Sequence, residues 1–511
     1  MPEDVERREA GAPETDPLLA RRRKLEALEA QGIDAYPSGY EVTGTTDSLS
    51  EAFADDGPPV SGRLAGRVVS LRTHGASTFL HLADGGGRIQ VYLRRDEMGD
   101  ALYHLLQSVD LGDFLGVAGT LFRTRTGEVT VRAEDLRMLA KSLRTLPLGK
   151  EVADEGGSVR AYHRVVDPEF RYRQRYADLA VHSATRRVFH DRARIIRHLR
   201  DFLDERGFVE VETPVLQPLY GGATARPFEI HHHSLDMPLY LRIADELYLK
   251  RCIVGGMDKV YEIAKDFRNE GMDRFHNPEF TMLEFYQAYA DYKDLQVLTE
   301  ELLSGLVREM KGGTRLTYQG RTVDVAPPWP RVRFLDALAE KGADVDDLTR
   351  DALAGEARRR GIEVENRDGA GRILDALFRE LVEPDLEGPV FVLDHPAELS
   401  PLAKRRRDDP WLVERFEAYL FGREWGNAFS ELNDPRDQRA RFEGQAALAA
   451  AGDLESPFAV DEDFLRALEY GMPPTAGMGI GVDRVVMFLT DQPSIRDVIL
   501  FPLLRPERVE S

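Results

Sequence analysis

The chain is poor in features that would place it outside a reducing compartment. Its 511 residues include one cysteine, Cys252, which excludes an internal disulfide and any metal cluster built on cysteines. No apolar run approaches the length of a membrane span, and the charged N-terminus lacks the apolar core of a signal peptide. These absences predict a soluble, cytoplasmic protein with no membrane association.

The common nucleotide-binding motifs are also missing. The sequence has no Walker loop, no GxGxxG after a strand, and no regular alternation of strands and helices of the Rossmann type. Any nucleotide that binds here must therefore be held by another arrangement of residues.

Positive charge is in deficit, since 68 Lys and Arg stand against 89 Asp and Glu and give a net charge of -21. This balance argues against a surface that binds polyanions everywhere, but it allows local basic patches. Basic residues do cluster at 21–24, 171–175 and 186–200. Solvated helix faces explain most such clusters, so the clusters permit a nucleic-acid partner without showing one.

The length predicts two or three domains, and the first is an N-terminal region over 1–58. Residues 1 to about 16 are polar and are expected to be unstructured. The string PLLARRRKLEALEAQG then predicts an amphipathic helix that ends at Gly32. Its expected apolar stripe consists of Leu18, Leu19, Leu25 and Leu28.

A second domain is expected over 59–145, where the hydrophobic pattern changes to a period of two. About five short strands with Gly-rich turns predict a small closed barrel of the OB type, and the break at 84–87 marks a hairpin. A barrel with a purely structural role is the alternative.

Residues 146–165 are expected to be a linker, and residues 166–511 a large third domain. Long amphipathic helices over 192–206, 291–310 and 371–382 are mixed there with strands that read as antiparallel pairs. This mixture favours an α+β fold.

More potential binding groups lie in the strings FRNEG (267–271) and HNPEF (276–280) than in any other short stretch of the chain. The Arg268 guanidinium suits phosphate oxygens, and the Phe280 ring suits a purine. Further groups follow in the same stretch: Glu270, His276 and Asn277. Because alternate residues of a strand share a face, the string EFTMLEFY predicts one row of binding side chains: Phe280, Met282, Glu284 and Tyr286.

The string GMGIGVDRVVMFL predicts a Gly-rich strand that leads into a helix. Its glycines permit close approach of the backbone, Asp483 is expected to cap the helix, and Arg484 falls in the first turn. A helix N-terminus with an arginine suits a triphosphate. A plain strand-to-helix connection remains the alternative.

The string RFEAYLFGREWGNAFSELND predicts a hairpin that brings Glu424 back towards Glu417. Two carboxylates held together repel unless a cation separates them, so Mg²⁺ bound to nucleotide phosphates is the natural occupant. Asn427, Phe429 and Glu431 are expected to share a face of the return strand. A solvated acidic hairpin is the alternative.

Three glutamates from separate segments, Glu246, Glu284 and Glu431, are expected to meet beside the nucleotide. Buried carboxylates placed together are costly without a cationic partner, so such a pocket favours a substrate with an ammonium group. For Glu246, which falls at the start of a helix, simple capping is the alternative.

From HRVVDPEFRYRQRYADL to the C-terminus, the chain resembles the class II lysyl-tRNA synthetases of the bacterial type, which carry an N-terminal OB barrel. The resemblance rests on the three class II motifs at about 192–214, 262–286 and 476–489, and on the strings GGATARPF, DELYLKR, MLEFYQAYADY and GNAFSELND. It implies a multidomain fold: an all-β OB barrel, and an α+β catalytic domain with an antiparallel sheet flanked by helices. An inserted helical region is expected at about 330–390.

The resemblance also implies roles for individual residues. Arg268 would contact the α-phosphate of ATP and Arg484 the γ-phosphate, and Phe280 would stack on adenine with Glu270, His276 and Asn277 nearby. Glu417 and Glu424 would hold Mg²⁺, two or three ions with ATP. The implied lysine site consists of Gly222, Glu246, Glu284, Tyr286, Asn427 and Glu431. In the barrel, the residues implied to contact the tRNA anticodon are Arg72, Phe79, Gln90 and Glu128.

What the resemblance implies as a whole is a homodimer, joined through the first motif, that activates L-lysine with ATP and transfers it to tRNA(Lys). One departure adds negative charge beside the pocket: Asp245 stands where many relatives have proline. Thr224, where alanine is common, is a second departure.

Four rival functions are weighed against this one. An aspartyl- or asparaginyl-tRNA synthetase needs a cationic or amide-reading pocket, which the acidic residues oppose. A lysyl transferase to a protein would lack the barrel, and a transferase to membrane lipid would need membrane spans. A regulatory protein without catalysis would be expected to have lost the motif arginines or the metal carboxylates, yet all are present.

Overall fold

The computed structural model describes residues 16–153, 159–164, 167–365, 367–453 and 455–506. The chain forms two compact units, Met1–Val181 and His182–Ser511. The expectation of an unstructured tail falls on residues 1–15, which lie outside the described residues.

The first helix, α1 (Pro17–Ala30), begins where the Asp16 side chain accepts the Leu18 amide at 2.9 Å. The predicted stripe is partly wrong. Leu28 is fully buried, but Leu19 is 49% exposed, and Arg21 is buried in its place. Arg21 donates to the carbonyl oxygens of Ser142 (2.7 Å) and Leu111 (2.8 Å), so satisfied hydrogen bonds allow a charged residue on this face.

The first unit contains a closed barrel, as expected. Its strands run in the order β1-β2-β3-β5-β4, and β1 pairs with β4 to close the sheet. The elements are α2 (Thr46–Ala52), β1 (Ser61–His74), β2 (Ser77–Ala83), β3 (Arg88–Arg94), α3 (Arg95–Gln107), β4 (Phe114–Arg123) and β5 (Val129–Ala140). Alternate side chains of these strands fill the barrel.

The β2–β3 turn forms at the predicted Asp-Gly-Gly-Gly string. Asp84 accepts the amides of Gly86 (2.8 Å) and Gly87 (3.0 Å) and also bonds Thr46 at the start of α2. These donors outweigh the effect of burial and lower the pKa of Asp84.

The segment expected as a linker contains regular structure. Strands β6 (Leu148–Ala153) and β7 (Val159–Arg164) pair antiparallel, and α4 (Pro168–Arg173) and α5 (Arg175–Val181) complete the first unit.

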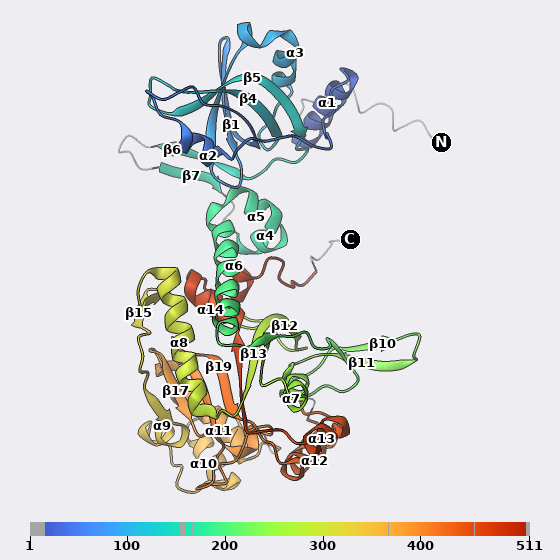
Figure 1. Cartoon of the computed structure of the whole chain (residues 1–511), viewed down its shortest axis with the longest axis vertical. Helices are drawn as coiled ribbons and strands as arrows, with labels where there is room; N and C mark the ends of the chain where they lie inside the picture. Colours follow the sequence, from blue (N-terminus) through green and yellow to red (C-terminus); the bar gives the residue numbers. More distant parts are fainter. Residues whose placement is uncertain (1–15, 154–158, 165–166, 366, 454, 507–511) are drawn as a thin grey trace. The chain divides into compact units, whose positions relative to one another are not determined.

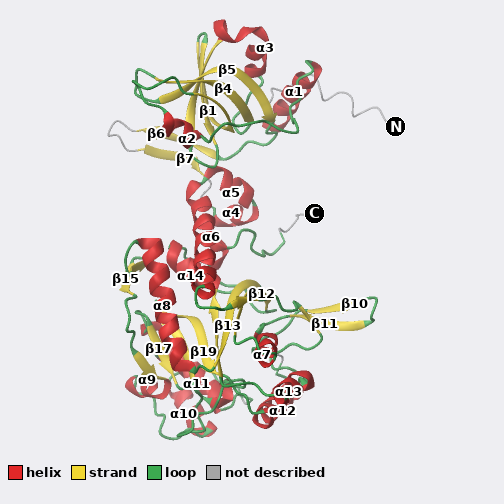
Figure 2. Ribbon diagram, viewed as in Figure 1, coloured by secondary structure: helices red, strands yellow, loops and turns green. Residues whose placement is uncertain are grey.

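The second unit is α+β, as Figure 2 shows by its mixture of helices and strands. Its large sheet has eight strands among the described residues, mostly antiparallel, with β16–β17 and β8–β12 parallel. In order across the sheet they are β16 (Arg331–Arg333), β17 (Val390–Leu393), β18 (Arg415–Leu420), β19 (Arg423–Ser430), β20 (Thr475–Gly481), β13 (Glu279–Ala288), β12 (Lys259–Phe267) and β8 (Val209–Glu210).

Three helices pack together on one face of this sheet: α6 (Ser183–Asp204), α8 (Tyr292–Lys311) and α14 (Val482–Thr490). The odd-numbered residues Leu283 and Phe285 of β13 point into this core. The even-numbered residues therefore face the other way, so the strand periodicity alone assigns them to the opposite surface of the sheet.

Smaller elements surround the sheet. Three helices expected as an insertion at about 330–390 share a hydrophobic core with β17. The elements not yet described are β9 (Leu216–Gln217), β10 (Glu229–His232), β11 (Met237–Leu241), α7 (Glu246–Val254), β14 (Arg315–Tyr318), β15 (Arg321–Asp324), α9 (Phe334–Glu340), α10 (Arg350–Arg359), α11 (Ala370–Leu381), α12 (Pro435–Ala450), α13 (Glu462–Glu469) and α15 (Ile495–Val498). Two short 3-10 turns lie at Glu383–Asp385 and Ala397–Leu399. None of the helices in the described ranges is both long and apolar enough to cross a bilayer.

Candidate functional site

A cavity of about 770 Å³ opens on the face of the large sheet opposite the three core helices. It brings together thirteen of the fourteen residues predicted for the third domain: Gly222, Glu246, Arg268, Glu270, His276, Asn277, Phe280, Glu284, Tyr286, Glu417, Glu424, Asn427 and Arg484. Glu431 does not line the cavity and lies behind its wall, 1% exposed.

One end of the cavity combines a guanidinium with an aromatic ring. Arg268 follows β12 and Phe280 lies on β13, and the Arg268 Cζ is 5.0 Å from the centre of the Phe280 ring. The Arg268 amide donates to the Pro278 carbonyl at 2.9 Å, which keeps the two segments together. An anion and a flat ring fit side by side here.

The loop between β12 and β13 holds the remaining predicted groups of this end. Glu270 is exposed, and the exposed His276 ring bonds Asp273 at 2.8 Å. Asn277 is buried and donates to the Glu279 carbonyl at 2.6 Å, while its Oδ1 has no donor among the described residues.

Arg484 lies in the first turn of α14, as predicted, and donates to the Glu424 carbonyl oxygen. The prediction for Asp483 is wrong, since its side chain does not cap the helix. Asp483 instead accepts from Arg192 of α6 at 2.5 Å and from the Thr281 amide at 2.7 Å. It therefore connects α6, β13 and α14 rather than completing one helix terminus.

Glu417 and Glu424 lie on the predicted hairpin. Glu417 is opposite Asn427, and a bulge after Ala418 places Tyr419 opposite Glu424. His395 and Arg415 outweigh burial and lower the pKa of Glu417, whereas burial, and then the Glu417 carboxylate, raises the pKa of Glu424 to about 7. Arg484 counters this only from 3.8 Å. The donor set fits a divalent cation with oxygen ligands.

Sequence reasoning missed the partner of Glu246 and Glu431. The ammonium of Lys250, which is fully buried, lies 2.5 Å from Glu246 Oε1 and forms an ion pair with Glu431. Burial would lower the pKa of Lys250, but the two carboxylates outweigh it and raise the pKa. The Glu-x-x-x-Lys spacing in ELYLK was the available signal, because residues four apart are neighbours on a helix.

Glu284 takes a different position from the other two glutamates. Its Oε2 accepts the Tyr286 hydroxyl at 3.0 Å, and burial, then Asp266 and Glu246, raises the pKa of Glu284 well above its usual range. The three glutamates thus all lie near Tyr286 at one cavity wall, where an acidic pocket was expected. Two of them already share Lys250.

Two glycines allow the wall to close around these groups. A Cβ on Gly222, whose φ is +89°, would come 3.0 Å from the Cβ of Ala244 and 3.3 Å from that of Glu246. A Cβ on Gly477 would lie 2.2 Å from the Tyr286 ring and 2.3 Å from Glu431 Oε1. Any side chain at either position would displace a predicted binding residue.

Arg415, which was not predicted, forms hydrogen bonds with two of the predicted cavity residues. It donates to Asn427 Oδ1 at 2.8 Å and to Glu417 Oε1 at 2.6 Å. Its position two residues before Glu417 on the same strand puts both on one face, which is the signal that could have identified it.

His395 is a buried group beside this hairpin, 2% exposed, and burial lowers its pKa from 6.5 to about 4. A histidine held neutral stabilises the fold fully above pH 6.5, and that stability is lost as the pH falls from 6.5 towards 4. The difference corresponds to about 3 kcal/mol. We expect His395→Gln to lose this part of the acid sensitivity, measured as the free energy of unfolding in urea across this pH range. Parallel pH curves for the two proteins would contradict the assignment.

The four residues predicted on the barrel occupy one surface of β1, β2, β3 and the turn before β5. Arg72 is opposite Phe79 in the β1–β2 ladder, and the Phe79 ring lies 4.9 Å from that of Tyr92. Gln90 donates to Glu128 at 2.8 Å and accepts from Thr130 at 2.9 Å. A partly exposed ring beside an amide held by hydrogen bonds is a suitable surface for an unstacked base.

Comparisons with known proteins agree with this geometry. The family model described as tRNA synthetases class II (D, K and N) matches residues 167–505, and that of the OB-fold nucleic acid binding domain matches 63–139. A lysine–tRNA ligase of Moorella thermoacetica is 51% identical over 500 residues, which cover 97% of this chain and 99% of the relative. One of Pelotomaculum thermopropionicum is 50% identical over 494 residues, covering 96% and 95%. One of a Thermoanaerobacter species is 47% identical over 495 residues, covering 96% of each.

Proposed function

This chain belongs to the class II tRNA synthetases, in their lysine–tRNA ligase group, and we propose how its cavity joins lysine to tRNA. The enzyme activates L-lysine with ATP to lysyl-adenylate and then transfers the lysyl group to the 3′-terminal adenosine of tRNA(Lys). The observation that carries the assignment of the site is a single cavity lined both by an arginine–phenylalanine pair and by buried glutamates.

In the first step, a lysine carboxylate oxygen attacks the α-phosphorus of ATP, and the bond to pyrophosphate breaks. This nucleophile is already an anion, so no protein base is required. We assign Arg268 to the α-phosphate, Phe280 to the adenine face, and Arg484 to the terminal phosphate. Catalysis then comes from positioning and from fixed positive charge near the phosphates. The remaining adenylate contacts are assigned to Glu270, His276 and Asn277.

Enzymes of this group depend on ATP with a divalent metal. We propose that the metal is Mg²⁺, held by Glu417 and Glu424, with two or three ions when ATP is bound. The raised pKa of Glu424 supports this assignment, because a nearby cation would relieve the repulsion between the two carboxylates. When bound, the metal would offset the charge of the triphosphate. Arg415 and Tyr419 hold the Glu417 carboxylate in place at 2.6 and 2.7 Å.

We propose that the glutamate end recognises lysine. Lys250 compensates only one of the two charges on Glu246 and Glu431, so this group retains a net negative charge that suits one substrate ammonium. Glu284 with the Tyr286 hydroxyl offers a second acceptor on the same wall, and Gly222 and Asn427 complete the lining. The test is lysine-dependent exchange of pyrophosphate into ATP, measured against all twenty amino acids. Activation of an acidic or amide side chain in preference to lysine would overturn the assignment.

The rivals fit this cavity less well. A site for aspartate or asparagine would need a cation or amide at the glutamate end, where the described side chains leave an excess of carboxylates. Transfer to membrane lipid is disfavoured because the described helices include no candidate span. A cytoplasmic setting stays a prediction from the single cysteine.

We propose that the barrel reads the anticodon through Phe79 and Gln90, with Arg72 and Glu128 beside them. Phe79→Ala is expected to weaken tRNA charging by about 1–3 kcal/mol, roughly 5- to 150-fold in kcat/KM for tRNA, because one stacked base is lost. Adenylate formation should be unchanged. The matched control is Tyr103→Ala, a ring on α3 outside this surface. Equal losses in charging and in pyrophosphate exchange would contradict the role of Phe79.

A homodimer is proposed from the apolar edge of the large sheet. Strand β8 is the last in the strand order, and Val209 on it is 50% exposed. Val215 and Leu216, which follow a few residues later in the chain, are exposed as well. An apolar sheet edge is a surface that a second copy of the chain can cover.

A further inference from the structure

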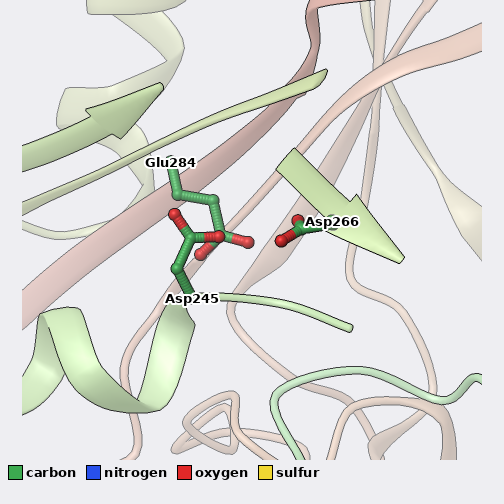
Figure 3. A group of neighbouring side chains, drawn as sticks. All are labelled: Asp245, Asp266 and Glu284. Carbon is green, nitrogen blue, oxygen red and sulfur yellow. The ribbon is translucent and has the colours of Figure 1, made fainter. Parts of the chain in front are cut away.

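Three carboxylates meet behind the cavity wall, and two of them were not expected to do so. Oxygen atoms of Asp245, Asp266 and Glu284 all lie within 4.8 Å of one another. Figure 3 shows the three side chains pointing towards one another from the start of α7, from β12 and from β13. Asp245 and Asp266 are both fully buried. Neither lines the cavity, whereas Glu284 does, so the cluster extends from the cavity into its wall.

Asp245 has no partner that explains its position. It precedes α7, where an aspartate commonly accepts a backbone amide of the first turn, but its side chain makes no capping bond. No donor among the described residues reaches either of its carboxylate oxygens. A fully buried carboxylate normally has its hydrogen bonds satisfied, so an unpartnered one that points into a cluster indicates a missing cation.

The cations near the cluster are fewer than its carboxylates. The neighbouring cations are Arg242, which lies 2.7 Å from Glu262 and 3.4 Å from Asp266, and Arg268. Four carboxylates, namely Asp245, Glu262, Asp266 and Glu284, therefore face two guanidiniums. Lys250 does not contribute, because it is paired with Glu246 and Glu431. When all four carboxylates are ionised, two negative charges are uncompensated.

We propose that Asp245, Asp266 and Glu284 bind one divalent metal ion. A cation of the Ca²⁺ or Mn²⁺ type takes carboxylate oxygens at about 2.3–2.6 Å, so one ion reaches three oxygens spaced as these are. The all-oxygen donor set selects hard cations over zinc or copper. The ion is distinct from the one assigned to Glu417 and Glu424, and it holds the Glu284 carboxylate in a fixed orientation beside the cavity.

The protonation tendencies agree with this geometry. Burial, and then the neighbouring carboxylates, raises the pKa of Asp245 and of Glu284 well above the usual range, while burial raises that of Asp266 to about 6 despite Arg268 and Arg242. A bound cation offsets the same repulsion without protonation.

The test is a titration of the full chain with Mn²⁺, without nucleotide or lysine, at a pH near 8. Free Mn²⁺ is measured by electron paramagnetic resonance in a Glu424→Gln background, which removes the other proposed metal site. This protein is expected to bind one equivalent. Adding Asp245→Asn should weaken Mn²⁺ binding at least tenfold. Asp266→Asn should weaken it to the same extent, and it replaces the first variant where Asp245→Asn folds poorly. Glu279→Gln, which changes an exposed carboxylate outside both the cluster and the cavity, is the matched control and should bind as before.

Two outcomes would overturn the proposal. One is the absence of a bound equivalent, and the other is unchanged binding in both aspartate variants. A carboxylic-acid band in the infrared spectrum that disappears in Asp245→Asn would show that protons compensate the charge instead. Because no substrate is present, failure here leaves the lysine–tRNA ligase assignment intact. That assignment fails separately if lysine does not support pyrophosphate exchange.

Discussion

Glu284→Gln is expected to lower lysine activation at least about 100-fold in kcat/KM. The substitution keeps the shape of the side chain but removes the negative charge that we assign to binding the ammonium group of the lysine substrate. A buried ammonium left unpaired costs about 3–5 kcal/mol. ATP binding should be largely retained, because the substitution leaves Arg268, Phe280 and Arg484, the side chains assigned to ATP, in place. Lysine-dependent pyrophosphate exchange measures the loss, and calorimetric titration with ATP measures what is retained.

The same strand provides the control. Glu279 also lies on β13, but its side chain is 56% exposed, lies outside the cavity and is 3.8 Å from Lys265. Glu279→Gln should therefore exchange pyrophosphate as the unmodified enzyme does. A near-normal exchange rate in Glu284→Gln would refute the assignment of the lysine pocket.

The second large effect concerns stability rather than catalysis. Lys250→Met is expected to lower the free energy of unfolding by about 3–5 kcal/mol, because it leaves Glu246 and Glu431 buried without their cation. Methionine preserves the length and apolar contacts of the side chain, so the lost charge dominates the effect. Urea unfolding followed by tryptophan fluorescence at a pH near 8 measures the change, since Trp329 and Trp425 are buried in the core of this unit.

Lys265→Met is the matched control for this prediction. The Lys265 side chain is 44% exposed, and its ammonium lies 3.8 Å from Glu279, so its loss should change stability by less than about 1 kcal/mol. If Lys250→Met unfolds at the same urea concentration and with the same slope as the control, then Glu246 and Glu431 do not require this cation.

Much of the candidate site followed from periodicity and spacing. The alternation along EFTMLEFY correctly placed Phe280, Glu284 and Tyr286 on one face, because a strand has a period of two. The hairpin of Glu417 and Glu424 followed from the turn near Gly422, whose φ is +71°. The closed barrel followed from short alternating strands and the Asp-Gly turn at 84–87. Each of these features depends on residues that are close in the chain.

Charge partners between distant segments did not follow in the same way. Asp483 was expected to cap its own helix, but it bonds Arg192, which lies nearly three hundred residues earlier. Arg21 replaces Leu19 in the buried face of α1 because carbonyl groups near residues 111 and 142 accept its protons. Which acidic side chain receives which cation depends on the packing of several strands and helices.

The sequence alone determined the fold class and most of the predicted residues that line the cavity, because local periodicity, residue type and the resemblance of its motifs carry that information. Only the tertiary structure decided how the buried charges are shared. It paired Lys250 with two of the three expected glutamates, and it placed Asp245 and Asp266 beside the third. Electrostatic energies in a buried site depend on distances of a few ångströms between segments that are remote in the chain, and no sequence pattern specifies those distances.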